Sequence, residues 1–129
     1  MTIELDHVIV SARNPRAAAQ RLGELLGVRW AASGIGPFSP VYVNDGLTLD
    51  FIDDPGPFPI QHFCFRVDDE AFDAILERLR AAGIAYRSTV RGPVDSKINT
   101  DYGGRMIYWN EPDGHQWEML TVSYARAAT

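Results

Sequence analysis

Two stretches of the chain carry apolar residues three or four positions apart, which is helical spacing. Their apolar stripes are Ala18, Leu22, Leu25 and Leu26 in the first stretch and Phe72, Ile75, Leu76 and Leu79 in the second. Each stretch follows an Asn or Asp residue suited to capping a helix N-terminus, and each is closed by a glycine, Gly27 or Gly83. The pattern predicts helices over about residues 15–26 and 69–82.

Short segments with alternating apolar residues surround both predicted helices and predict β-strands. They are residues 3–10, 28–31, 41–43 and 47–52 around the first helix, and residues 60–67, 84–89 and the two arms of a hairpin within 108–121 around the second. The hairpin turns at Glu-Pro-Asp-Gly, a strong turn sequence that ends at Gly114. Three prolines within residues 53–59 exclude a helix or a central strand there and indicate a linker.

The order of elements is therefore βαβββ, a linker and βαβββ again, which predicts an α+β fold with an internal repeat. A chain of 129 residues is long enough for one domain with its own core. We expect a single domain over residues 1–129, built from module 1 (1–53), a linker (54–59) and module 2 (60–129).

Composition narrows the range of functions. Apolar residues make up 46% and charged residues 22% of the chain, as in ordinary soluble proteins. The net charge of −5 and the absence of a basic run argue against a nucleic-acid partner. No apolar run is long enough to span a membrane, and no secretory signal is visible at the N-terminus. The one cysteine, Cys64, excludes an internal disulfide and suggests the reducing cytoplasm.

Four polar residues fall at two pairs of equivalent positions in the repeat. His7 lies 20 residues before the glycine that closes the first helix, and His62 lies 21 residues before its counterpart. Asp50 and Glu118 each follow a turn glycine by four positions in the last strand of their half. Alternation places all four on the strand face opposite the apolar residues that cover the helices. If the two sheets face each other, the four side chains converge as a nitrogen–oxygen site for one divalent ion, Zn²⁺, Ni²⁺, Co²⁺, Mn²⁺ or Fe²⁺.

The chain resembles the vicinal oxygen chelate superfamily, which includes glyoxalase I, extradiol dioxygenases, thiol-transferase fosfomycin-resistance proteins and bleomycin-resistance proteins. The resemblance rests on residues 5–10 (LDHVIV), 61–65 (QHFCF), 102–105 (YGGR), 111–115 (EPDGH) and 117–118 (WE). It implies paired βαβββ modules that form a cupped mixed sheet around a metal, with ligands at His7, His62 and Glu118. The fourth position, Asp50, is a Glu in glyoxalase I and is not a ligand in the dioxygenases or fosfomycin enzymes. A homodimer is also implied.

Further residues are candidates for contacts with a substrate. Arg66 shares the face of His62 and suits an anionic or carbonyl-bearing ligand, or else a surface carboxylate. Tyr108 could face the cavity as a hydrogen-bond donor, or it could be an ordinary core residue. Arg105 lies in the loop before a strand that faces the site. Cys64 is expected to be a small buried hydrophobe rather than a nucleophile. His115, in the hairpin turn, is expected to be exposed and structural.

Two classes of function follow. The first is a divalent-metal-dependent enzyme acting on a small oxygen-chelating substrate. If Asp50 or Glu118 leaves the metal to act as a base, lyase or isomerase chemistry of the glyoxalase type results. If only His7, His62 and Glu118 bind, the two-histidine, one-carboxylate set suits O₂ chemistry with Fe²⁺. The alternative is a metal-free protein that binds and sequesters a small molecule such as an antibiotic. The paired ligand positions favour the enzyme.

Overall fold

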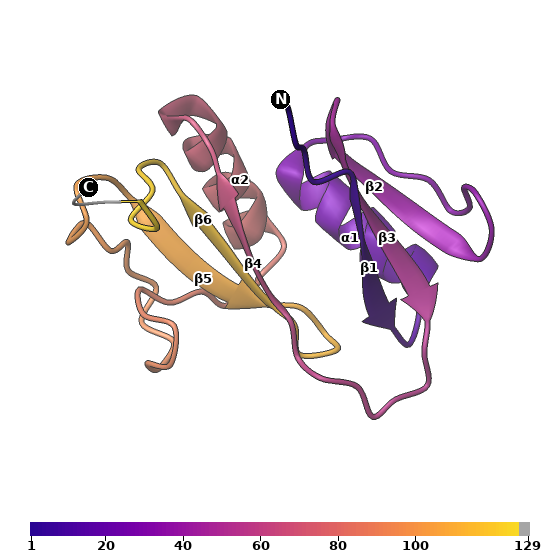
Figure 1. Cartoon of the computed structure of the whole chain (residues 1–129). Coiled ribbons are helices and arrows are strands. Elements are labelled where there is room, and N and C mark those ends of the chain that lie inside the picture. The colour runs from indigo at the N-terminus through magenta and orange to yellow at the C-terminus, as the bar shows by residue number, and fades with distance from the viewer. Residues whose placement is uncertain (127–129) are drawn as a thin grey trace. The chain divides into compact units, whose positions relative to one another are not determined.

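The computed structural model describes residues 1–126, which form two compact units (Figure 1). The first unit is Met1–Pro59, and the second begins at Ile60, directly after the last proline of the predicted linker. Of the helices in this described part, none combines the length and apolar character needed to cross a membrane.

Unit 1 is a three-stranded sheet with one helix packed on it. Its elements are β1 (His7–Ala12), α1 (Pro15–Leu26), β2 (Phe38–Asn44) and β3 (Leu47–Asp53). β3 is the central strand, parallel to β1 and antiparallel to β2. As predicted, the Asn14 side chain caps α1 by accepting a hydrogen bond from the Ala17 amide at 3.1 Å. Gly27 ends the helix with a left-handed φ of 73°, a conformation that costs glycine little.

A glycine inside α1 has a packing cause. Gly23 is buried, although glycine weakens a helix interior by roughly 1 kcal/mol relative to alanine. A Cβ at this position would lie 2.8 Å from both Cβ and Cδ1 of Trp30. The indole of Trp30 therefore lies directly against the helix backbone, and no larger side chain fits between them.

Unit 2 repeats the topology of unit 1. Its elements are β4 (His62–Arg66), α2 (Asp69–Ala81), β5 (Met106–Asn110) and β6 (Gln116–Leu120). β6 is central, parallel to β4 and antiparallel to β5, and α2 lies across one face of this sheet (Figure 1). Asp68 caps α2 through the Ala71 amide at 2.8 Å. The helix buries its predicted stripe, which consists of Phe72, Ile75, Leu76 and Leu79.

Strand register confirms that the two units repeat position by position. The first residue of β1, His7, pairs with Thr48, and the first residue of β4, His62, pairs with Gln116. Asp50 and Glu118 each lie two residues further along the central strand of their unit. The α+β prediction with an internal repeat is therefore confirmed.

The first strand of the chain is shorter than predicted. Strand β1 begins at His7 instead of residue 3, although the Thr48 amide still donates to the Asp6 carbonyl at 3.0 Å. Its neighbour β3 starts at Leu47, so residues 3–5 lie beyond the end of the strand that would pair with them. Ile3 and Leu5 are exposed accordingly.

Two further predicted strands, 28–31 and 84–89, are reduced to single bridges, Trp30 with Val41 and Arg87 with Tyr108. In the second of these segments, side chains form hydrogen bonds with backbone groups that would otherwise pair with a neighbouring strand. Arg87 donates to the Val90 carbonyl, and Asp95 accepts from the Ser88 amide at 3.0 Å.

Candidate metal centre

One face of the unit 2 sheet carries the predicted chemistry, and the other faces the apolar core. In β4, His62, Cys64 and Arg66 point one way. Phe63 and Phe65 point the other way, with ring centroids 5.3 and 5.9 Å from that of Trp117. Glu118, on the central strand β6, lies on the face of His62. We call this face, with His62, Cys64, Arg66, Tyr108, Gln116 and Glu118, the site face.

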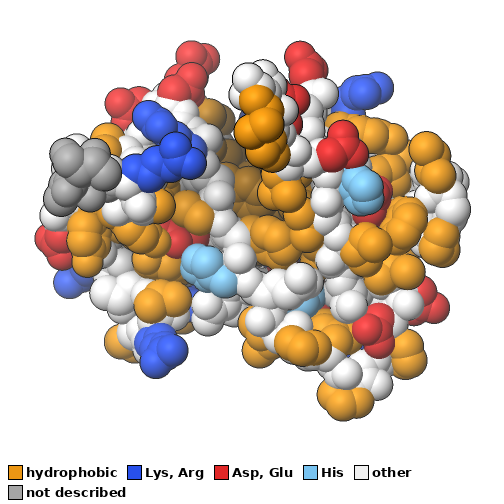
Figure 2. Space-filling view, in the orientation of Figure 1, with side chains coloured by type: hydrophobic (Ala, Val, Ile, Leu, Met, Phe, Trp, Pro, Cys, Tyr) orange, Lys and Arg blue, Asp and Glu red, His pale blue; other side chains and the backbone are white. Residues whose placement is uncertain are grey.

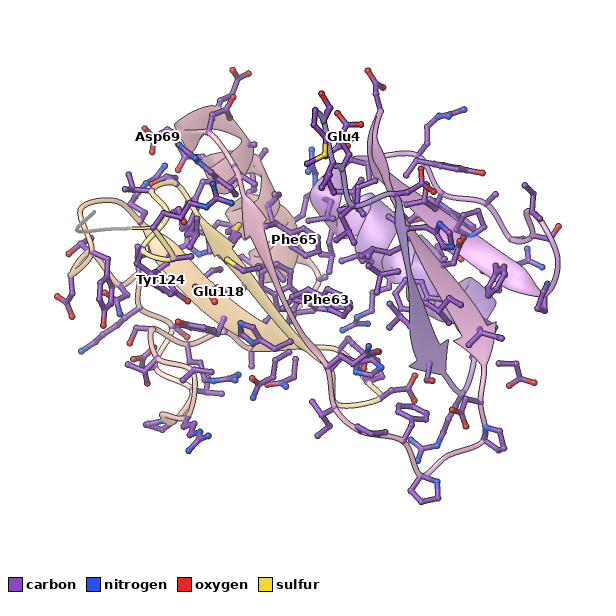
Figure 3. All side chains as sticks on the ribbon, viewed as in Figure 1. Glu4, Phe63, Phe65, Asp69, Glu118 and Tyr124 are labelled. Atoms are coloured by element: carbon purple, nitrogen blue, oxygen red, sulfur yellow. The ribbon has the colours of Figure 1, made fainter. Side chains whose placement is uncertain are left out.

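Glu118 is a completely buried carboxylate, with 0% exposure. Its Oε1 lies 3.0 Å from Nε2 of His62. The hydroxyl of Tyr124 donates to both carboxylate oxygens, at 3.0 Å to Oε1 and 2.9 Å to Oε2 (Figure 3). A carboxylate has about four lone-pair positions, and the Cys64 thiol and the Tyr108 hydroxyl also interact with this one. Burial of this charge in a central strand is costly without such compensation.

The second nitrogen of His62 is oriented as in many metal-binding histidines. Nδ1 lies 3.3 Å from Oε1 of Gln116, an amide oxygen that accepts a hydrogen bond when Nδ1 carries the proton. A metal at Nε2, the nitrogen beside Glu118, requires that tautomer, whereas a hydrogen bond from Nε2 to Glu118 requires the proton on Nε2. A metal-bound histidine usually donates its other N–H to such an acceptor, which holds the ring in place. His62 and Glu118 therefore supply one nitrogen and one oxygen donor of the types that divalent metals bind.

Unit 1 holds the equivalent pair in a looser form. Nδ1 of His7 lies 2.8 Å from Oδ2 of Asp6, both side chains being exposed. The hydrogen bond with Asp6 raises the pKa of His7, and the nearby charge of Asp50 adds a smaller upward effect. Asp50 lies half-buried on the central strand β3, across from Ile9. As in unit 2, the histidine Nδ1 faces an oxygen acceptor, which leaves Nε2 for a metal.

The two units place the four predicted ligands as two pairs, His7 with Asp50 and His62 with Glu118. Within residues 1–126, no three His, Cys, Asp or Glu side chains form a group that could hold a metal. The complete four-residue ligand set therefore stays a prediction.

Two neighbours of Glu118 stay protonated at neutral pH. Desolvation, with a smaller contribution from the Glu118 charge, raises the pKa of the Cys64 thiol to about 12. Burial likewise raises the pKa of Tyr108, which pairs with Glu118 across the strands and is 7% exposed. The expectation that Cys64 is buried is wrong, because β4 is an edge strand whose site face is open at this position. A protonated thiol is a poor nucleophile, as expected.

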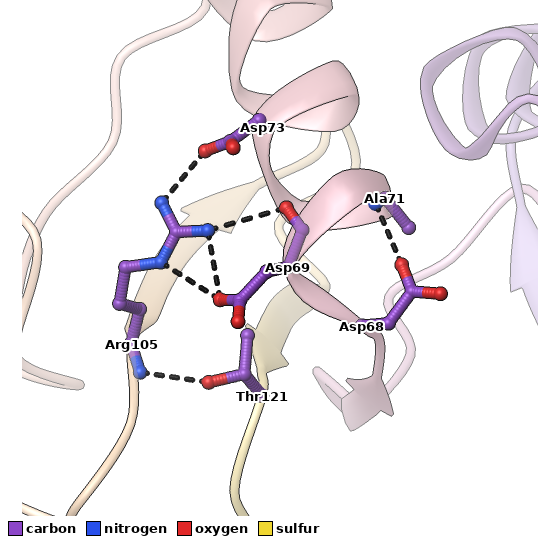
Figure 4. Close-up of polar contacts among 6 residues, drawn as sticks. All are labelled: Asp68, Asp69, Ala71, Asp73, Arg105 and Thr121. Atoms are coloured by element: carbon purple, nitrogen blue, oxygen red, sulfur yellow. Dashed lines mark hydrogen bonds and ion pairs between the residues drawn. The ribbon is translucent and has the colours of Figure 1, made fainter.

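Arg105 is engaged by the helix α2 (Figure 4). Its guanidinium donates to Asp73 at 2.7 Å and to Asp69 at 3.0 Å, and lies 4.3 Å above the ring centre of Phe72. These contacts raise its pKa and secure the start of β5 to α2. They give Arg105 a structural role, and its predicted contact with substrate stays a prediction, as do those of Arg66 and Tyr108.

His115 corrects another expectation. It was expected to be exposed but is completely buried. Its Nδ1 accepts a hydrogen bond from the Gln61 amide at 3.0 Å, and its own amide donates to Oε1 of Glu111 at 2.9 Å. The imidazole thus connects the hairpin turn to the residue before β4. Its role is structural, and it is buried because it supplies an acceptor that this backbone amide needs.

Residues 4–119 match the sequence model of the Glyoxalase/Bleomycin resistance protein/Dioxygenase superfamily. The protein belongs to this superfamily. Among solved structures it is similar to Oxidase ChaP-H2, with 37% identity, a TM-score of 0.91 and coverage of 99% of this chain and 100% of that one. Oxidase ChaP-H1 is 40% identical, with a TM-score of 0.88 and coverage of 95% and 98%.

More distant members of the superfamily share the fold alone. The fosfomycin resistance protein FosX from Mesorhizobium loti is 19% identical, with a TM-score of 0.69 and coverage of 97% of both chains. A comparison with curated proteins found no match. The two solved relatives at 37% and 40% identity are both named as oxidases.

Sequence reasoning missed two residues of the centre. Strand alternation places Gln116 on the face of Glu118, but it does not predict the contact of the Gln116 side chain with His62. Tyr124 follows the last strand in a segment without regular structure. No periodic pattern connects it to Glu118, and only the folded backbone brings the two together.

Proposed function

We propose that this protein is a divalent-metal-dependent oxidase that acts on a small oxygen-chelating substrate. The observation that carries the proposal is the wholly buried Glu118 carboxylate against Nε2 of His62, with Nδ1 facing Gln116. Likeness at 37–40% identity to two proteins named oxidases favours O₂ chemistry over lyase chemistry.

The proposed ligands are His62 and Glu118 from unit 2 with His7 from unit 1. Asp50 is proposed as a fourth ligand or as a base. When bound, a metal of this two-histidine, one-carboxylate type supplies Lewis acidity and, as Fe²⁺, the capacity to activate O₂. The substrate's adjacent oxygens suit the positions that protein ligands leave free.

The chain's own residues orient and protect the centre. Gln116 holds the His62 ring through Nδ1, and Tyr124 holds the Glu118 carboxylate through its hydroxyl. Tyr108 keeps its phenolic proton at neutral pH, so it is available as a hydrogen-bond donor beside Glu118. The single cysteine fits a cytoplasmic setting, and we propose a homodimer as the working form.

Metal content tests the proposal. Untagged protein purified without chelator is analysed beside His62→Ala, Glu118→Gln and the double variant His7→Ala/His62→Ala, with the exposed Glu77→Gln as control. We expect about one metal per chain in the wild type and Glu77→Gln, and loss in the other three. A wild type that stays empty and refuses added divalent ions would move the assignment to a metal-free small-molecule binder.

The identity of the chemistry needs a second readout. Protein loaded with Fe²⁺ under argon is exposed to nitric oxide, an O₂ mimic that gives an electron paramagnetic resonance signal when it binds ferrous iron. A signal in the wild type and none in Glu118→Gln would support an oxidase with an open metal position. Tight Zn²⁺ or Ni²⁺ binding without a nitric oxide signal would favour lyase chemistry.

A further inference from the structure

Unit 2 contains a pocket of about 480 Å³ beside the metal-binding pair. Its lining includes Cys64, Arg66, Leu120, Val122, Tyr124 and Arg126. The size suits a small organic molecule, and apolar side chains supply much of the wall. Tyr124 links the pocket to the centre, because the same hydroxyl that lies at the pocket binds Glu118.

The two arginines of this pocket lack acidic partners. Other arginines of the chain are engaged, as Arg105 is by Asp69 and Asp73 and Arg87 by the Asn110 side chain. Among residues 1–126, no carboxylate pairs with Arg66 or Arg126. Lys and Arg side chains gather beside the C-terminal end of the chain on the face seen in Figure 2. Two exposed guanidinium groups at one apolar pocket form a site suited to a carboxylate.

We infer that this pocket binds the carboxylate of an apolar organic acid and that Arg66 and Arg126 select this class of substrate. The inference rests on the proposed function, since it places the oxidised part of the molecule at His62 and Glu118. His62, Cys64 and Arg66 follow one another on one face of β4, and four residues of strand span about 13 Å. A carboxylate at Arg66 is therefore held about 13 Å along the strand from His62.

Naphthalene-2-carboxylate and its neutral amide, 2-naphthamide, test the inference by isothermal titration of metal-free protein. We expect the carboxylate to bind about tenfold more tightly than the amide at low salt, and the preference to shrink as salt rises. Arg66→Gln should reduce the preference, Arg66→Gln/Arg126→Gln should abolish it, and Arg66→Lys should keep most of it. Arg91→Gln, an exposed arginine outside the pocket, is the control.

Several results would overturn the inference. They are equal binding of the two probes to the wild type, no binding of either up to about 5 mM, or an unchanged preference in the double variant. Sulfate is a second test that needs no substitution. If the two arginines bind the carboxylate, added sulfate should weaken the binding of naphthoate to the wild type. Metal binding is measured in a separate titration. A preference for naphthoate without metal binding would contradict the proposed function alone. Metal binding without that preference would contradict this inference alone.

Discussion

Removal of the Tyr124 hydroxyl is the most direct test of how the buried Glu118 carboxylate is stabilised. It donates to both oxygens of Glu118, and the other side chains that meet this buried carboxylate are His62, Cys64 and Tyr108. Tyr124→Phe removes this donor and leaves the ring. Tyr102→Phe is the matched control, because its ring lies 5.3 Å from that of Tyr124, and within the described residues its hydroxyl makes no hydrogen bond.

The expected loss follows from the contact. A hydrogen bond to a charged group contributes about 1.5 to 3 kcal/mol to stability. Tyr124 is 38% exposed, so water reaches the site and the lower end applies. We expect the metal-free variant to lose about 1.5 kcal/mol of unfolding free energy. For a chain of 129 residues this corresponds to a fall in Tm of about 6 °C.

Urea and thermal unfolding of the metal-free proteins at pH 7 measure the effect. Adding Glu118→Gln completes a double-mutant cycle, in which we expect a coupling of about 1 kcal/mol between the two sites. Additive effects, or a Tyr124→Phe protein as stable as Tyr102→Phe, would show that the hydroxyl does not stabilise the carboxylate. The reasoning about a compensated buried charge would then fail.

Three further predictions concern parts of the chain outside the centre. Gly23→Ala places a Cβ 2.8 Å from Trp30 and should destabilise unit 1 by about 1 to 3 kcal/mol, visible as a lower urea midpoint with an unchanged slope. The Ser88 hydroxyl lowers the pKa of Asp95, so it stabilises the fold above the unfolded pKa of about 3.9. Ser88→Ala should therefore cost stability at pH 7, and the difference from wild type should fade as the pH falls below that value. Arg105→Met should lower the free energy of unfolding by about 1 kcal/mol without changing the metal content. If this variant instead keeps its stability and binds ligand differently, Arg105 contacts the substrate.

Helical spacing of apolar residues and the capping residues were sufficient to predict the helices. Strand alternation and the internal repeat were sufficient to predict the pairing of His62 with Glu118. The prediction of this pair succeeded because a charged side chain in a buried central strand is costly without a partner. It also succeeded because the same spacings between His, carboxylate and glycine residues occur in both halves of the chain.

Prediction from the sequence failed where side chains competed with backbone pairing, as after Arg87. It also failed for His115, whose burial depends on one distant donor, the Gln61 amide. The contact of Tyr124 with Glu118 could not be predicted from the sequence, because the segment that carries Tyr124 has no periodic pattern of apolar residues.

The two halves of the repeat differ in a way that predicts how a metal would bind. In unit 2 the carboxylate is buried, and the histidine beside it is oriented by Gln116, so little freedom is lost when both bind a metal. In unit 1 His7 is exposed beside Asp6, and Asp50 is one methylene shorter than its counterpart. Preorganised ligands contribute most to affinity, because less ordering is required on binding. We therefore expect Glu118→Gln to weaken Zn²⁺ binding far more than His7→Ala in competition with a chelating dye. Equal losses would mean that the order seen in unit 2 is a feature of the fold without consequence for the metal.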